Sequence, residues 1–199
     1  MLLALAAIAG VTVAAPPSGA AVEDEVTAIA SSKEDLTSSG GQSQDARLAA
    51  NGRFVAFRSA ATNLVAGDTN GKADIFLRDL QKGTTVRASM AGNGAQLVGG
   101  DSSLPTVSGD GTEVLFQTDA TNAVAGDANA KTDVYVRNLN AGFTERISVN
   151  GGEVALTAGA TAPAMSSNGR YVVFDSATTQ VFGDPDNQKE SERFYALDE

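Results

Sequence analysis

Unbroken apolar runs alternate with short turns and long polar loops along most of the chain. The clearest runs are residues 54–57, 114–116 and 171–174, and each follows a turn that contains Asn-Gly or Asp-Gly. A continuous apolar run indicates a strand covered on both faces, and these dipeptides are the strongest short hairpin signals. Apolar stripes of helical period are absent after residue 22. The pattern predicts a nearly all-β chain from that point.

The strands recur in the same order three times. The glycine of the turn is Gly52, then Gly111, then Gly169, so the spacings are 59 and 58 residues. A period of this length is typical of a four-stranded unit that buries its faces by stacking on copies of itself. The sequence therefore predicts β-propeller blades of four antiparallel strands, about three in this chain, at residues 46–89, 105–148 and 163–198.

The individual strands follow from the apolar runs. We expect them at residues 46–49, 53–59, 74–80, 84–89, 105–108, 112–118, 133–139, 143–148, 163–166, 170–176 and about 193–198. The third unit lacks a fourth strand, and residues 26–31 read like the fourth strands of the other units, so we expect them to close the third blade. Rings usually need about four to eight blades. Two alternatives stay open: the chain is a fragment of a longer protein, or a homodimer completes six blades.

Three motifs of the second unit carry a resemblance to a known family. They are Ser108-Gly-Asp-Gly111, Asp133-Val-Tyr-Val-Arg137 and Thr144-Glu-Arg-Ile-Ser148. In this order they resemble the repeat of the TolB-type β-propeller family, over the chain from about Val26 to its end. The resemblance implies a WD-like propeller fold and a role as an envelope or secreted interaction module, or as blades that precede a serine-peptidase domain. The loops here are longer than the family repeat, so no partner of a family member is carried over.

The first residues suggest export. Residues 1–15 are almost entirely apolar and are followed by small residues up to Ala21, which predicts a signal peptide over residues 1–21 and a propeller domain over residues 22–199. No Lys or Arg precedes the apolar core, so an uncleaved N-terminal anchor and a short buried helix remain as alternatives. The chain has no cysteine, hence no disulfide framework and no lipoprotein attachment site. We expect a secreted or periplasmic protein.

Composition limits the chemistry. The chain has 24 acidic and 14 basic residues, a net charge of −10, and this balance disfavours nucleic acid and anionic membrane surfaces as partners. It has no His and no Cys, which removes Ser-His-Asp triads, thiol nucleophiles and imidazole metal sites. We therefore expect no enzymatic activity. A glycosidase that uses paired carboxylates is the remaining alternative, with Asp101, Asp119 and Asp175 as candidates.

Two loops repeat the same oxygen-bearing side chains at the same offsets. The candidates are Asp68, Asn70, Asp74, Asp127, Asn129 and Asp133. This spacing is compatible with a calcium ion. However, lysine occupies the fifth position of each loop and no glutamate occupies the twelfth, unlike an EF-hand, and Asx side chains bonded to their own backbone explain the same residues. We expect no cofactor, with calcium as the alternative at these six residues.

The connections between strands differ in length on the two faces of each unit. Those between the first and second strand and between the third and fourth strand of a unit are short, whereas residues 60–73 and 90–104 form long connections that must share the opposite face. Scaffolds commonly place recognition in loops held by a rigid frame. The sequence predicts a binding module that recognises a protein or glycan through its long-loop face. The alternative is a non-catalytic accessory propeller domain of a larger hydrolase of the peptidase type.

Overall fold

The computed structural model describes residues 40–127, 129–150, 154–177 and 195–197. The predicted signal peptide, the predicted closing strand at residues 26–31 and the third Gly-Asp loop at residues 183–187 lie outside the described residues. Within the described part of the chain there is no helix, and hence none that is long and apolar enough to cross a membrane. The fold is all-β, as the sequence predicts.

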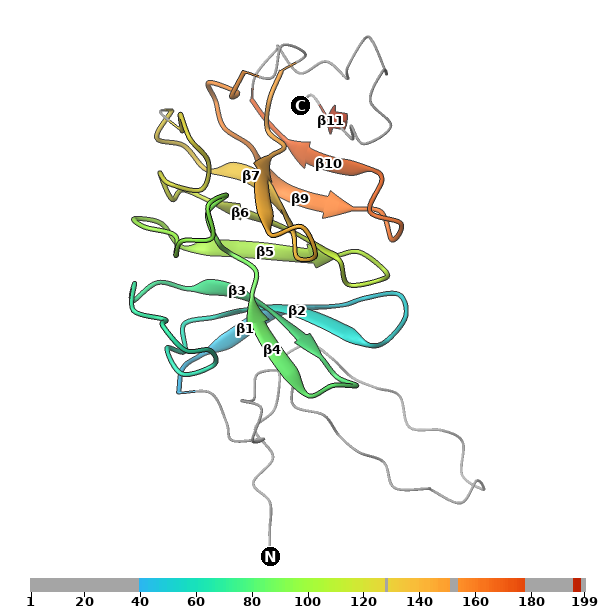
Figure 1. Cartoon of the computed structure of the whole chain (residues 1–199). Helices are drawn as coiled ribbons and strands as arrows, with labels where there is room; N and C mark the ends of the chain where they lie inside the picture. The colour runs from blue at the N-terminus through green and yellow to red at the C-terminus, as the bar shows by residue number, and fades with distance from the viewer. Residues whose placement is uncertain (1–39, 128, 151–153, 178–194, 198–199) are drawn as a thin grey trace, which may run out of the picture.

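Eleven strands occur in the described residues. They are β1 (Ser43–Leu48), β2 (Phe54–Ser59), β3 (Asp74–Asp79), β4 (Thr84–Arg87), β5 (Ser102–Val107), β6 (Glu113–Thr118), β7 (Asp133–Asn138), β8 (Phe143–Arg146), β9 (Thr161–Met165), β10 (Val172–Asp175) and β11 (Tyr195–Leu197). They form three sheets in chain order, β1-β2-β3-β4, β5-β6-β7-β8 and β9-β10-β11. The first two are fully antiparallel. Each sheet is a propeller blade, and Figure 1 shows the blades stacked face to face from blue to orange.

The third blade departs from the prediction in one pairing. β10 pairs antiparallel with β9 but parallel with β11, whereas the corresponding pairs β2–β3 and β6–β7 are antiparallel. A parallel pair requires a crossover connection of about a dozen residues or more. The segment between β10 and β11 is long enough to provide one.

The first strand of each blade, which we call the innermost strand, begins earlier than predicted. β1, β5 and β9 begin at residues 43, 102 and 161, not at 46, 105 and 163. Each contains a β-bulge, and Asp45, Leu104 and Ala162 at these bulges have positive φ values of 56°, 49° and 52°. A bulge breaks the two-residue alternation of side chains. The residues of each strand that precede the bulge therefore resemble a loop in the sequence.

Two predicted features of the connections are confirmed. Residues 49–53 and 108–112 form tight turns in which Gly52 and Gly111 have positive φ values of 70° and 75°. The connections at residues 60–73, 88–101, 119–132 and 147–160 are long. All of the long ones join the same ends of the strands, on the left in Figure 1, and we call this side the loop-rich face.

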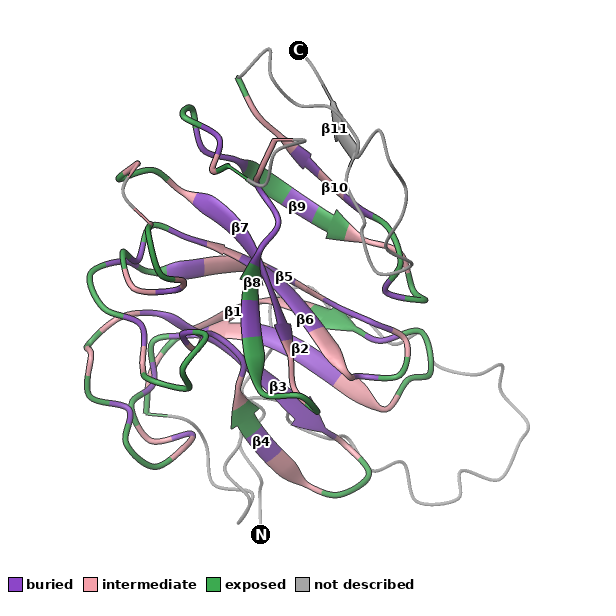
Figure 2. Ribbon diagram, turned by 45° about the horizontal axis from the view of Figure 1, so that its top comes forward, coloured by how far each residue is buried: buried purple, intermediate pink, exposed green. Residues whose placement is uncertain are grey.

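The core lies between the blades and repeats with them. Val114, Phe116 and Tyr135 of blade 2 pack against Ala56, Ile75 and Leu77 of blade 1. At the equivalent positions one unit later, Val172 and Phe174 of blade 3 pack against Leu115, Val134 and Val136 of blade 2. Figure 2 shows the resulting buried residues concentrated in the middle strands of the sheets. Both faces of each middle strand are covered, which explains the unbroken apolar runs.

Candidate functional site

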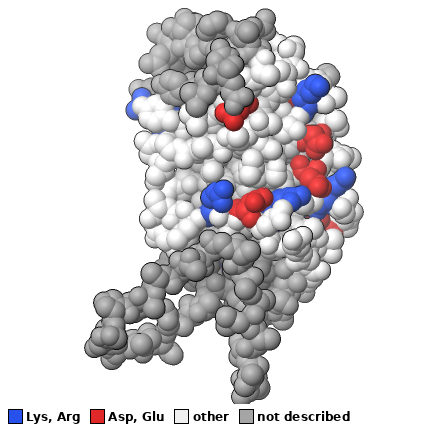
Figure 3. Space-filling view, turned by 180° about the vertical axis from the view of Figure 1, so that it is seen from behind, with Lys and Arg blue, Asp and Glu red and all other residues white. Residues whose placement is uncertain are grey.

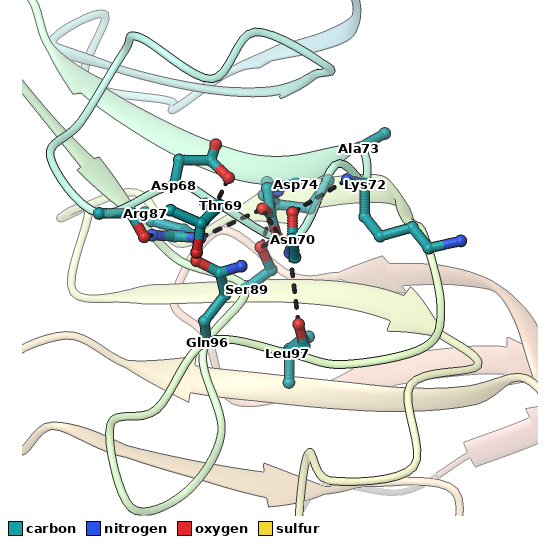
Figure 4. Close-up of polar contacts among 12 residues, drawn as sticks. Asp68, Thr69, Asn70, Lys72, Ala73, Asp74, Arg87, Ser89, Gln96 and Leu97 are labelled. Carbon is teal, nitrogen blue, oxygen red and sulfur yellow. Dashed lines mark hydrogen bonds and ion pairs between the residues drawn. The ribbon is translucent and has the colours of Figure 1, made fainter.

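The six predicted loop residues do come together, in two similar clusters on the loop-rich face. In each cluster the two aspartates and the asparagine of one loop meet an arginine and a serine at the end of the fourth strand of the same blade. Cluster 1 is Asp68, Asn70, Asp74, Arg87 and Ser89, and cluster 2 is Asp127, Asn129, Asp133, Arg146 and Ser148. Figure 4 shows cluster 1.

Asp74 is the centre of cluster 1. Its Oδ1 accepts a hydrogen bond from Ser89 Oγ at 2.6 Å, and its Oδ2 accepts from Asn70 Nδ2 at 3.1 Å and from Arg87 Nη1 at 3.3 Å. The same guanidinium atom lies 3.5 Å from Asp68 Oδ1 (Figure 4). Asn70 Nδ2 also donates to the carbonyl of Leu97. The cluster thus ties the loop at residues 60–73 to the connection at residues 88–101.

Cluster 2 repeats the serine and asparagine contacts, but its arginine pairs with the first aspartate alone, and a tyrosine is added. Ser148 Oγ and Asn129 Nδ2 donate to Asp133 at 2.7 and 2.8 Å, and Arg146 Nη2 lies 3.1 Å from Asp127 Oδ1. The hydroxyl of Tyr135 donates to the other oxygen of Asp127 at 2.7 Å. These ion pairs give Arg87 and Arg146 a structural role.

In both clusters, burial has the largest effect on the pKa of an aspartate. It raises the pKa of the Asp68 carboxyl, with a further increase from the charge of Asp74 and a partial decrease from Arg87. It also raises the pKa of Asp133, although the hydrogen bonds from Ser148 and Asn129 oppose the increase. The charge of Arg87 lowers the pKa of Asp68 and that of Arg146 lowers the pKa of Asp133, so each guanidinium offsets part of the effect of burial.

This geometry bears on the calcium hypothesis. A calcium ion needs six to eight oxygen ligands. In cluster 1 the two carboxylates already face a guanidinium, and Asn70 directs its Nδ2 toward Asp74. No group of three acidic, His or Cys side chains suited to a metal occurs among the described residues. Calcium binding at these six residues stays a prediction.

The two clusters differ at one aromatic position, which yields a stability prediction. Phe76 occupies the place of Tyr135 and stacks on Phe57 as Tyr135 stacks on Phe116, with ring centroids 5.8 and 6.0 Å apart. The carboxylate of Asp68 accepts no hydrogen bond in the described residues, and its Oδ1 faces Arg87. Tyr135 donates to the oxygen of Asp127 that does not face Arg146, so we expect Phe76→Tyr to donate to Asp68 Oδ2 and to raise the free energy of unfolding by about 1 kcal/mol in urea titrations.

The control for this prediction is Phe57→Tyr. It adds the same hydroxyl to the other ring of the pair, at a position where the equivalent residue of blade 2 is also phenylalanine, Phe116. We expect this variant to be destabilised, because the repeat provides no hydrogen-bond acceptor for a buried hydroxyl at this position. Equal effects of the two variants would contradict our assignment of the Asp68 carboxylate as the acceptor.

The loop-rich face also contains a polar recess between blades 1 and 2. Its volume is about 190 Å³, and it is lined by Gln42, Gln44, Arg58, Ala60, Gly71, Ala73 and Asp101. Arg58 Nε donates to the carbonyl of Ser102 at 3.0 Å, and Arg58 Nη2 lies 3.4 Å from Asp101 Oδ2. Sequence reasoning missed this site. The available signal was that Arg58, Gln117 and Asp175 occupy one repeat position with three different chemistries.

The three candidate glycosidase carboxylates are spread over two blades. Asp101 precedes β5 and Asp119 follows β6 in blade 2, whereas Asp175 ends β10 in blade 3. Asp101 lines the recess, and its Oδ1 accepts a hydrogen bond from the backbone of Ala73 at 3.0 Å. The Asp101 carboxylate is thus engaged in supporting the loop at residues 60–73.

Comparison with known proteins gives likenesses at the level of structure alone. No protein-family model and no curated protein sequence matches the chain. Among solved structures, it is similar to TolB from Acinetobacter baumannii, with 20% identity and a TM-score of 0.37 over 66% of this chain and 25% of that one. It is also similar to the β-propeller domain of the Trilobed protease from Pyrococcus furiosus, with 12% identity and a TM-score of 0.41 over 67% of this chain and 34% of that one.

A peptidase shows a similar likeness. The acylaminoacyl peptidase from Pyrococcus horikoshii is 18% identical, with a TM-score of 0.38 over 66% of this chain and 16% of that one. The chain therefore spans about a third or less of the length of each of these structures. The assignment of propeller blades rests on the three sheets and the repeated packing between them.

Proposed function

We propose that this protein is a secreted or periplasmic propeller module that binds a protein or glycan partner through its loop-rich face. The observation that supports this proposal is the difference in loop length between the two faces of the blades. The long connections between β2 and β3, β4 and β5, β6 and β7, and β8 and β9 lie on one face, and the two Asp–Arg clusters tie successive connections of that face together through buried hydrogen bonds and ion pairs. Fixed loops bind with less loss of conformational entropy than mobile ones. Within blades 1 and 2, the described connections of the opposite face are tight turns.

The proposal assigns binding and no catalytic step to the chain. The sequence has neither the histidine nor the cysteine on which most nucleophilic and acid–base sites depend. The aspartates of the two clusters contact arginine, asparagine, serine and tyrosine side chains of the protein itself. A homodimer that completes six blades stays part of the prediction for the partners.

Lysines on the loop-rich face test the proposal. Thr62 and Ala66 are exposed in the loop at residues 60–73. We expect the double variant Thr62→Lys/Ala66→Lys to lose partner binding by about tenfold or more, because two bulky charges would be placed inside the interface. The measurement is capture from an envelope extract, identification of the captured molecule by mass spectrometry, and titration of that molecule in purified form.

The matched control places two lysines on the opposite face. Gln81 and Asn140 are exposed in tight turns, so Gln81→Lys/Asn140→Lys changes the net charge by the same amount. We expect this variant to bind the purified molecule with unchanged affinity. Equal losses in both variants would mean that net charge, and not the loop-rich face, determines binding.

A further inference from the structure

The repeat position of Arg58 has a structural task that does not need an arginine. In blade 2 the equivalent Gln117 reaches the innermost strand of the next blade, where its Oε1 accepts a hydrogen bond from the backbone of Ala162 at 2.9 Å. Arg58 reaches the same strand end one blade earlier and donates Nε to the carbonyl of Ser102. A glutamine is sufficient for a contact between neighbouring blades at this position. The guanidinium therefore brings donors and a positive charge beyond what the fold requires.

Those extra donors face the recess. Arg58 uses Nε fully, but Nη2 has only the 3.4 Å contact with Asp101, and Nη1 makes no hydrogen bond within the described residues. Gln42 and Gln44 line the same recess, and their side-chain amides have no hydrogen-bond partner in the described part of the chain. The recess thus presents a guanidinium fork flanked by two amides, with Gly71 and two alanines leaving its walls open.

The neighbouring strand adds a second kind of recognition. β1 is the terminal strand of its sheet, so among the described residues no strand is hydrogen-bonded to the edge of Gln44 that faces away from β2, just before the bulge at Asp45. An unpaired strand edge accepts an extended peptide through main-chain hydrogen bonds. A guanidinium fork matches the two oxygens of a carboxylate. One molecule satisfies both features, namely a peptide whose last residue enters the recess.

We infer that this recess binds the C-terminal carboxylate of an extended peptide, with Arg58 as the residue that recognises the carboxylate. The inference rests on the proposed function and specifies its partner as a protein with a free C-terminus. A volume of about 190 Å³ equals roughly six water molecules at liquid density, which is the scale of one terminal residue and its carboxylate.

The net charge of −10 does not prevent this binding. Figure 3 shows acidic and basic groups side by side in a band on the side seen from behind, with uncharged surface around it, so the excess of acids does not form one continuous patch there. The local competitor is Asp101, whose side chain is 53% exposed. Its Oδ1 is bonded to Ala73, but its Oδ2 competes for Arg58. Removal of that charge should strengthen binding of a carboxylate.

The test is a nuclear magnetic resonance titration of the full chain labelled with ¹⁵N. The probe is a pool of N-acetylated pentapeptides with free C-terminal carboxylates, compared with the same pool amidated at the C-terminus. We expect the free-acid pool to shift the side-chain amide signals of Gln42 and Gln44 and the amidated pool to leave them unchanged. Arg58→Gln, which installs the residue of blade 2, should weaken binding roughly tenfold to 100-fold with an unchanged melting temperature.

Asp101→Asn is the opposing variant. It keeps an oxygen for the backbone of Ala73 and removes the competing charge, so we expect it to bind the free-acid pool more tightly than the native chain does. Equal binding of acid and amide pools, or native affinity in Arg58→Gln, would overturn the inference. Binding of an oligogalacturonate in place of the peptides, lost in Arg58→Gln, would replace the peptide with an acidic glycan and also overturn it.

The outcomes separate this inference from the proposed function. If the lysine variants of the loop-rich face lose the captured partner while Arg58→Gln retains it, the face binds but the recess does not. If Arg58→Gln loses the peptides while the lysine variants bind every captured molecule normally, the recess is a peptide site and the broader assignment to the loops is wrong.

Discussion

Arg87→Leu is expected to lower the free energy of unfolding by about 3–5 kcal/mol. The guanidinium lies within 3.5 Å of Asp68 and Asp74, and the side chains of all three residues are less than a tenth exposed. Leucine removes the positive charge and leaves two carboxylates close together in a buried site. The measurement is equilibrium unfolding in urea at about pH 7.

The pH dependence distinguishes lost charge from lost packing. Burial and Asp74 already hold the pKa of Asp68 above its ordinary value, and the variant removes the one charge that lowers it. The folded state of the variant then binds more protons than the unfolded state, so its stability rises as the pH falls from about 7 to about 5. The deficit relative to the native protein should shrink over that range. A deficit that is independent of pH would point to packing alone.

Two further variants complete the experiment. Asp68→Asn combined with Arg87→Leu removes one of the two buried carboxylates that have lost their arginine, and we expect the double variant to recover part of the lost stability. Lys82→Met removes an exposed positive charge in a tight turn and should change stability by no more than about 0.5 kcal/mol. A similar loss for Lys82→Met and Arg87→Leu would mean that net charge causes the effect.

The blades were predictable from the sequence because their signals are local. A turn glycine and an apolar run such as residues 54–57 identify a middle strand, and the period identifies the stacking. The innermost strands were placed two or three residues too late, since a bulge at a residue such as Leu104 depends on the strand beside it. The parallel pairing of β11 was also unpredictable, because the direction of pairing across a long connection depends on contacts that are distant in the chain.

The candidate sites were predictable to different degrees. The oxygen-bearing residues of the loops were found by their repetition, but their partners Ser89 and Ser148 were not, because a serine at a strand end has many ordinary uses. The recess was missed altogether, because it joins residues from β1, β2 and the start of β5. The sequence does show that Arg58 differs from Gln117, the residue at the same repeat position in blade 2. This difference can be interpreted only once the structure shows which contact Gln117 makes.

Phe116→Ala is expected to cost about 3–5 kcal/mol, since a fully buried aromatic ring would be removed from the contact between two blades. The ring packs among Ala56, Ile75 and Leu77 of blade 1, whose backbones are fixed by their own sheet, so the cavity cannot close easily. The matched control is Val173→Ala in β10, a half-buried side chain, which we expect to cost about 1 kcal/mol. Urea unfolding followed by circular dichroism measures both.

The same variant tests whether the blades unfold together. In stacked repeats stability is the sum of the stability of each unit and the contacts between neighbours. If those contacts dominate, amide hydrogen exchange in Phe116→Ala should accelerate equally at Ile75 of blade 1 and at Tyr135 of blade 2. Acceleration in blade 2 alone would mean that blade 1 is stable without its neighbour. Because Arg58 and Asp101 come from these two blades, the coupled outcome would also mean that the recess between them is lost whenever either blade unfolds.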